Sequence, residues 1–120
     1  MSCDGSEIAL AREVAFQPLL HVPKPAEREV LKAVAALMRE RPDILLIRIE
    51  VATRDDPRGD PERIRAAVES TQRRADAVLR YLWRSEKVSA ERMEALGLGH
   101  GDRANPGQRF TTRLRIVTRR

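Results

Sequence analysis

The fold of this chain is decided by the stretch Ser70-Thr71-Gln72-Arg73-Arg74-Ala75-Asp76-Ala77-Val78-Leu79-Arg80-Tyr81-Leu82. Its apolar residues recur at three- and four-residue spacings, which predicts an amphipathic helix. Arg74 lies one position off the apolar stripe, so its stem can pack on apolar surface while its guanidinium reaches the rim. A guanidinium beside a core stripe is well placed to meet a planar anion such as a carboxylate.

The start of this helix is marked upstream in the sequence. Asp60 has the character of an N-cap, Pro61 suits the first helical position, and Glu62 suits the positive end of the helix dipole. We expect the helix to reach about Glu86. Its buried stripe is predicted to consist of Ile64, Ala67, Val68, Thr71, Ala75, Val78, Leu79 and Leu82.

A second helix and a strand precede it. Residues 26–39 are predicted to form a helix, because Val30, Leu31, Val34, Leu37 and Met38 make one apolar stripe, and Arg41-Pro42-Asp43 ends it. Residues 44–51 are predicted to form a strand. Its second half alternates, with Ile47, Ile49 and Val51 on one side and Arg48 and Glu50 on the other, as in a sheet with one covered face.

Three further strands are predicted at residues 8–16, 93–98 and 113–118, with Leu114 and Ile116 facing inward on the last. The element order is then β-α-β-α-β-β. Such alternation predicts an α+β fold, a mixed sheet with both helices packed on one face. Residues 1–7 are expected to be a disordered tail, and residues 8–120 a single domain.

The composition limits the class of partner. The 120 residues carry a formal net charge of +5, which favours an anionic partner. Aromatic residues are few, and no two are spaced to form a base-stacking platform. Only the scattered arginines support a nucleic-acid-binding domain, so nucleic acid is not the expected partner. No run approaches the roughly 20 apolar residues of a membrane span, and we expect no transmembrane segment.

Cofactor and metal sites are not expected. Cys3 is the only cysteine, so neither an internal disulfide nor a thiolate zinc site can form. His21 and His100, the only histidines, fall in different predicted loops. Cys3 is interpreted as an exposed tail thiol, and the alternative is a lipid-modified mature terminus.

The sequence gives no support for catalysis. No serine or threonine has a histidine placed by a recognisable motif, and most carboxylates fall on predicted solvated helix faces. Gly97-Leu98-Gly99 lacks the third glycine of a dinucleotide fingerprint and does not open a helix. We therefore expect a protein that is not an enzyme.

A binding site is suggested by Asp55-Asp56 and Arg74. The loop after a strand lies over the carboxyl edge of the sheet, near the following helix, so the two charges can meet there. One interpretation is that the site binds a zwitterion. The protein's carboxylate would then bind the ammonium group of the ligand, and its guanidinium the carboxylate of the ligand. The other is a surface Asp–Arg pair that only tethers the loop. Spacing alone leaves both open.

Segments along the chain carry a family resemblance. They are Val14-Ala15-Phe16-Gln17-Pro18, Glu29-Val30-Leu31-Lys32-Ala33-Val34-Ala35-Ala36-Leu37, Arg41-Pro42-Asp43-Ile44, Ile47-Arg48-Ile49-Glu50, Gln72-Arg73-Arg74-Ala75-Asp76-Ala77-Val78 with Tyr81-Leu82, Val88-Ser89-Ala90-Glu91-Arg92, Gly97-Leu98-Gly99 and Arg113-Leu114-Arg115-Ile116. In order and spacing they resemble the OmpA-like C-terminal domain, the peptidoglycan-associating module of outer-membrane proteins, associated lipoproteins and flagellar stators. The similarity extends from about Ile8 to Val117.

The resemblance implies a site for the diaminopimelate residue of the peptidoglycan stem peptide. In the family a loop aspartate and the arginine of an Arg-Ala pair bind it, and the latter matches Arg74. Val51-Ala52-Thr53-Arg54 occupies the family's Gly-His-Thr-Asp site, so Arg54 stands in place of the aspartate and Asp55 follows it. The resemblance assigns the amino group to Asp55, and gives Arg113, retained from a usual Asn-Arg-Arg, a contribution of positive potential.

The function implied is non-covalent binding of peptidoglycan in a Gram-negative periplasm, in association with the outer membrane and cell wall. Other envelope proteins are further candidate partners. The alternative is a degenerate family member that no longer binds cell wall and serves as a structural or protein-interaction module. If Arg54 faces the ligand's ammonium in place of an acid, like-charge repulsion weakens or abolishes zwitterion binding.

Overall fold

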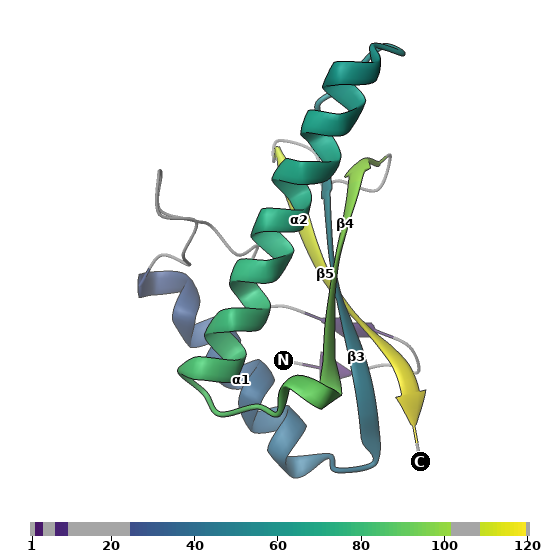
Figure 1. Ribbon diagram of the computed structural model, residues 1–120. Coiled ribbons are helices and arrows are strands. Elements are labelled where there is room, and N and C mark those ends of the chain that lie inside the picture. The colour runs from purple at the N-terminus through teal and green to yellow at the C-terminus, as the bar shows by residue number, and fades with distance from the viewer. Residues whose placement is uncertain (1, 4–6, 10–24, 102–108, 120) are drawn as a thin grey trace.

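The chain folds into one mixed sheet with two helices, in a computed structural model that describes residues 2–3, 7–9, 25–101 and 109–119 (Figure 1). The elements in chain order are β1 (Ser2–Cys3), β2 (Glu7–Ala9), α1 (Pro25–Glu40), β3 (Ile44–Thr53), α2 (Pro61–Arg84), the short 3-10 helix η1 (Ala90–Arg92), β4 (Met93–His100) and β5 (Phe110–Arg119). The strand order across the sheet is β1-β2-β5-β3-β4.

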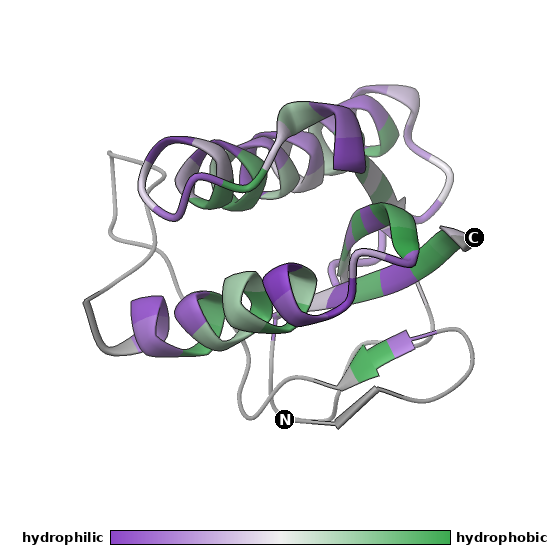
Figure 2. Cartoon of the chain, turned by 90° about the horizontal axis from the view of Figure 1, so that it is seen from below, coloured by the Kyte–Doolittle hydropathy of each residue, from purple (hydrophilic) through white to green (hydrophobic). Residues whose placement is uncertain are grey.

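The sheet is mixed because β3 has neighbours of both directions. It pairs in parallel with β4, which returns after the α2 crossover, and antiparallel with β5. Strand β5 pairs antiparallel with β2, and β2 with β1. Helices α1 and α2 pack on one face (Figures 1 and 2). The predicted α+β fold, with its element order, is confirmed.

The alternation predicted for β3 is what builds the core. Ile47, Ile49 and Val51 are fully buried beneath the helices, whereas Arg48 lies on the other face of the sheet and pairs with Glu94 of β4 at 2.6 Å. Leu114 of β5 lies opposite Ile49 and is also fully buried. The helices complete this core with Leu31, Val34, Ala35, Met38, Ala75, Ala77, Val78 and Leu82.

Helix α2 approaches β4 so closely that only glycine fits between them. A Cβ placed on Gly97 would lie 2.6 Å from the Cα of Gln72, and closer still to its backbone nitrogen. The Gln72 side chain accepts a hydrogen bond from the Gly97 N–H at 2.8 Å and donates one to the Ala95 carbonyl at 3.1 Å. The Thr71 hydroxyl accepts from the Gly99 N–H at 3.0 Å. These bonds occupy the outer backbone groups of an edge strand, which would otherwise invite pairing with another chain.

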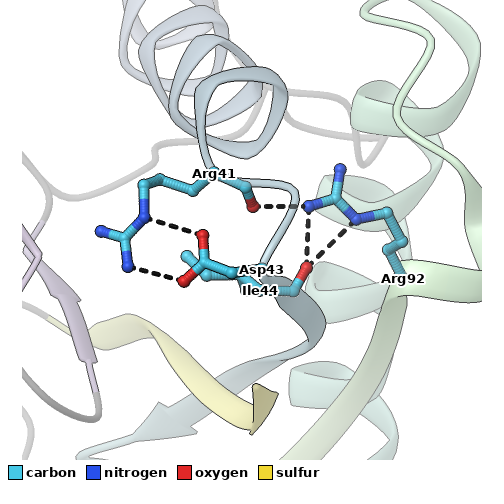
Figure 3. Close-up of polar contacts among 4 residues, drawn as sticks. All are labelled: Arg41, Asp43, Ile44 and Arg92. Carbon is cyan, nitrogen blue, oxygen red and sulfur yellow. Dashed lines mark hydrogen bonds and ion pairs between the residues drawn. The ribbon is translucent and has the colours of Figure 1, made fainter. Parts of the chain in front are cut away.

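Arg92 joins the end of α1 to the start of β3. Its guanidinium donates to the carbonyls of Arg41 at 3.0 Å and Ile44 at 2.8 Å, as Figure 3 shows, and also to the Met38 carbonyl at 3.0 Å. A helix leaves its last carbonyls without intrahelical partners, so a cation there satisfies them and complements the dipole. Arg41 and Asp43 form a bidentate pair beside it, at 2.9 and 2.8 Å (Figure 3).

The boundaries differ from the predictions in three places. Only Ile8 and Ala9 of the first strand predicted at residues 8–16 lie within the described residues, and both belong to strand β2. Ser2–Cys3, expected in a disordered tail, pairs with Ile8 and Ala9 as β1, because β2 offers backbone partners on its outer side. Strands β4 and β5 are longer than predicted and take in Gly99, His100 and Phe110.

The predicted stripe of α2 is wrong at its N-terminal end. Asp60 is the N-cap as expected, with its carboxylate accepting from the Glu62 N–H at 3.0 Å. Ile64 and Val68, however, are 45% and 42% exposed, whereas Val78 and Leu82 are fully buried. The first turns of α2 extend past the ends of the strands beneath it (Figure 1), so they have no sheet to pack on.

We predict that Gly97→Ala lowers the free energy of unfolding by about 3 kcal/mol, because the added methyl group would clash with the α2 backbone, which cannot yield as a flexible side chain would. Gly59→Ala is the matched control. Gly59 has a φ of +77° and no atom within 4 Å of an added Cβ, so only backbone strain of about 1 kcal/mol is expected. Urea unfolding measures both, and equal losses would contradict the close approach.

We predict that Arg92→Met lowers the free energy of unfolding by about 2 kcal/mol, since three carbonyl groups lose a charged donor. Arg92→Lys retains one donor group and should lose less. Arg80→Met, on the exposed side of α2, should stay within about 0.5 kcal/mol of the original protein in the same thermal or urea unfolding experiment. An unchanged free energy of unfolding in Arg92→Met would show that the three hydrogen bonds of Arg92 do not stabilise the fold.

Candidate binding site

A cavity of about 360 Å³ opens between the loop after β3, the first half of α2 and the start of β5. Its wall combines carboxylates, guanidiniums, hydroxyls and one aromatic ring. The residues that line it are Thr53, Asp55, Asp56, Pro57, Arg63, Ala66, Ala67, Ser70, Arg109 and Phe110. Segments far apart in sequence are brought together here because β3 and β5 are neighbours and α2 crosses over their end.

One side of the cavity is made of small residues on α2. Ala66, Ala67 and Ser70 follow one another at three- and four-residue spacings, so they share one face of the helix. None has more than two heavy atoms in its side chain. The space that larger residues would fill therefore stays open beside the charged groups of the loop.

Asp55 lies at the rim, held by its neighbours. Its carboxylate accepts a hydrogen bond from Arg109 Nε at 2.7 Å, and its backbone N–H donates to the Thr53 hydroxyl at 3.1 Å. The Asp55 side chain is 52% exposed and that of Arg109 is 71% exposed. Such an exposed ion pair contributes only about 0–1 kcal/mol, so another ion can replace either partner at little cost.

Arg74 contacts the site indirectly, by stacking on an aromatic ring that borders the cavity. The centre of its guanidinium lies 3.7 Å from the centroid of Phe110, and that of Arg109 lies 5.3 Å from the same centroid. Both separations are within the range of a cation–π interaction. The ring of Phe110 borders the cavity, and Arg74 lies against the ring rather than among the residues that line the wall.

Arg113 lies on the opposite face of the sheet from Phe110. Side chains alternate along β5, so Phe110, Thr112 and Leu114 face the helices while Thr111, Arg113 and Arg115 face away. Arg113 borders a different cavity of about 390 Å³ with the buried Glu50 and with Leu98. The structure thus places Asp55 in the wall of the first cavity and Arg74 beside it, and it does not bring Arg113 to them.

Arg109, Phe110 and Arg63 are site residues that the sequence did not indicate. Phe110 and Arg109 stand at the start of β5, and only the pairing of Phe110 with Thr53 reveals that they face the loop after β3. No pattern in the sequence indicates this pairing register, although Phe110 stands out as one of only four aromatic residues. Arg54, which the resemblance places at the ligand, has an exposed side chain, and its backbone N–H donates to the Arg109 carbonyl at 2.9 Å.

The described part of the chain holds neither a cluster of metal ligands nor a membrane-spanning helix. Among residues 2–3, 7–9, 25–101 and 109–119, histidine, cysteine and carboxylate side chains nowhere gather in groups of three or more that could hold a metal ion. Neither described helix is long and apolar enough to cross a membrane. His21 lies outside the described residues.

Similarity to known proteins is concentrated in one family. The model of the OmpA family matches residues 20–114. Similar solved structures are the peptidoglycan-associated lipoprotein from Burkholderia pseudomallei (22% identity, 86% of this chain and 89% of that chain, TM-score 0.59), a MotB-like protein from Desulfovibrio vulgaris (25%, 87% and 68%, 0.62) and the OmpA-like domain of FopA1 from Francisella tularensis subsp. tularensis SCHU S4 (10%, 98% and 98%, 0.62). No curated protein matches the chain.

We predict that the Arg74 side-chain N–H signals lie upfield of those of Arg80 in a proton–nitrogen correlation spectrum, because the ring of Phe110 shields protons above its face. Phe110→Leu should remove this shift and lower the free energy of unfolding by about 1 kcal/mol through loss of the cation–π interaction. Arg80, on the exposed side of α2, serves as the internal reference. Unshifted Arg74 signals in the original protein would contradict the stacked geometry.

Proposed function

This chain belongs to the OmpA family, and on that premise we propose that it is a non-catalytic cell-envelope module that binds peptidoglycan non-covalently through the diaminopimelate residue of the stem peptide. The observation that carries the proposal is the cavity whose wall includes both Asp55 and the Phe110 ring that stacks on Arg74. A carboxylate and guanidiniums around one opening match a ligand with an ammonium and a carboxylate group. A similar solved structure bears the name peptidoglycan-associated lipoprotein.

The proposed roles follow the charges of the site. Asp55 takes the amino group of diaminopimelate, exchanging its exposed pair with Arg109 for one with the ligand. Arg74 takes the carboxylate. Stacking on Phe110 engages the flat face of the guanidinium, whereas its N–H donors point outward in its plane. Arg113, on the far face, contributes positive potential only.

The proposed location is the periplasm, in association with the outer membrane and the cell wall, where peptidoglycan is available. Other envelope proteins are further proposed partners. The site supports recognition rather than reaction, because the charged groups that line the cavity within the described part of the chain are ion-pairing residues.

A second candidate function rests on the pairing of Asp55. Its carboxylate is already bound by Arg109, and Arg54 follows Thr53 where the family has an aspartate. A site with this added positive charge favours a degenerate module that has lost cell-wall binding and serves in structure or protein interaction. Binding to cell wall distinguishes the two candidates.

We predict that the protein co-sediments with purified peptidoglycan sacculi, and that Asp55→Asn and Arg74→Gln each weaken this binding by about tenfold or more, since each removes one charge-assisted hydrogen bond. Arg80→Gln removes an exposed arginine from the same helix and leaves the site intact, so it controls for the change in net charge.

The dissociation constants come from sedimentation at several protein concentrations and at constant ionic strength. Failure of the original protein to bind sacculi would reject the cell-wall proposal and favour the degenerate module. Equal weakening by Arg80→Gln would show that binding depends on net charge rather than on this site.

A further inference from the structure

We infer that Arg63 and Arg109 form a second anion subsite in the same cavity, which takes the carboxylate at the other end of diaminopimelate. This inference rests on the proposed function and deepens it. Asp55 and Arg74 account for one ammonium and one carboxylate. A diaminopimelate residue that ends a stem peptide, however, keeps a carboxylate at each end and one free amino group, so its second carboxylate also needs a partner.

The cavity is large enough for more than one end of such a ligand. Its volume of about 360 Å³ corresponds to about a dozen water-sized atoms, at roughly 30 Å³ each. That is the size of a whole diamino dicarboxylic acid rather than of a single ammonium–carboxylate head. A ligand held only between Asp55 and Arg74 would leave most of the space to water.

The two arginines border this space from different elements. Arg63 lies in the first turn of α2, and its Nε is 3.7 Å from the Asp60 carboxylate, beyond hydrogen-bonding distance. Arg109 comes from the other wall, next to Phe110. Their side chains are 68% and 71% exposed, so both guanidiniums are accessible to a ligand that enters from solvent.

The helix face between Arg63 and Arg74 is open along its length. Ala66, Ala67 and Ser70 occupy it, and their short side chains leave a path beside Phe110. Eleven residues of α-helix separate the two arginines, a rise of about 16 Å between their Cα atoms. Arg63 borders the cavity, and Arg74 stacks on Phe110, which borders it as well.

The charges of the wall match this ligand in sign. Asp55 and Asp56 supply two negative groups, and Arg63 and Arg109 supply two positive ones. With Arg74 on the ring of Phe110, the site offers partners to a terminal diaminopimelate residue, which carries one free ammonium and two carboxylates. A neutral sugar or an apolar peptide would leave these groups unsatisfied.

The test is titration calorimetry with a tripeptide that ends in meso-diaminopimelate, used as the free acid and with the carboxyl group at the L centre converted to the amide. The variants are Arg63→Gln and Arg109→Gln. Arg65→Gln, two residues along α2 and fully outside the cavity wall, is the matched control. All the changes lie at exposed positions, and thermal unfolding of each variant checks that the fold is retained.

We expect the original protein to bind the acid about fivefold or more tightly than the amide, because a charge-assisted hydrogen bond is lost with the carboxylate. Each cavity variant should lose that preference, and Arg65→Gln should keep it. An unchanged preference in both cavity variants, or an equal loss of affinity for acid and amide, would overturn the second subsite.

Different results would reject the proposed function and the second anion subsite. If the original protein binds both peptides and Asp55→Asn weakens both, the proposed function holds, and only an unaltered acid-to-amide ratio in the cavity variants rejects the subsite. If the original protein binds neither peptide, the proposed function and the subsite are rejected together.

Discussion

The close approach of α2 to β4 at Gly97 is the constraint on which the rest of the structure depends. The helix backbone lies where a side chain on Gly97 would have to be, and Gln72 and Thr71 bond it to the backbone of the strand. These contacts fix both the rotation and the height of α2 above the sheet. The same rotation buries Ala75, Val78 and Leu82, turns Arg63 and Ser70 toward the cavity, and brings Arg74 onto the ring of Phe110. The site is therefore a consequence of how the helix is seated.

The site combines weak interactions whose value lies in their arrangement. The pair between Asp55 and Arg109 is exposed, and the contact between Arg74 and Phe110 is a modest cation–π interaction. Neither stabilises the fold greatly, so both groups can change partners when an ion arrives. Small residues on α2 leave the room that this exchange requires. A site of this kind can bind and release a charged ligand reversibly.

The fold could be predicted from the sequence because local residue patterns determine most of its helices and strands. The alternation in β3, the stripe of α1 and the cap at Asp60 each appear in the structure where they were expected. The prediction that Ile64 and Val68 of α2 are buried was wrong. Periodicity shows which side of a helix is apolar, but it does not show where the sheet beneath the helix ends. The side chains of the site were harder to foresee. Asp55 and Arg74 could be named from the loop and the helix, but Arg109 and Phe110 enter through the register of β5, which no residue pattern encodes. The same alternation places Arg113 on the far face.

The most direct measurement is a crystal structure of the protein grown with a stem tripeptide that ends in diaminopimelate. The proposed site predicts electron density for the diaminopimelate residue in the cavity beside Phe110, with its free ammonium group within hydrogen-bonding distance of the Asp55 carboxylate. Density on the other face of the sheet, beside Arg113 and Glu50, with the Asp55–Arg109 pair left intact, would contradict it.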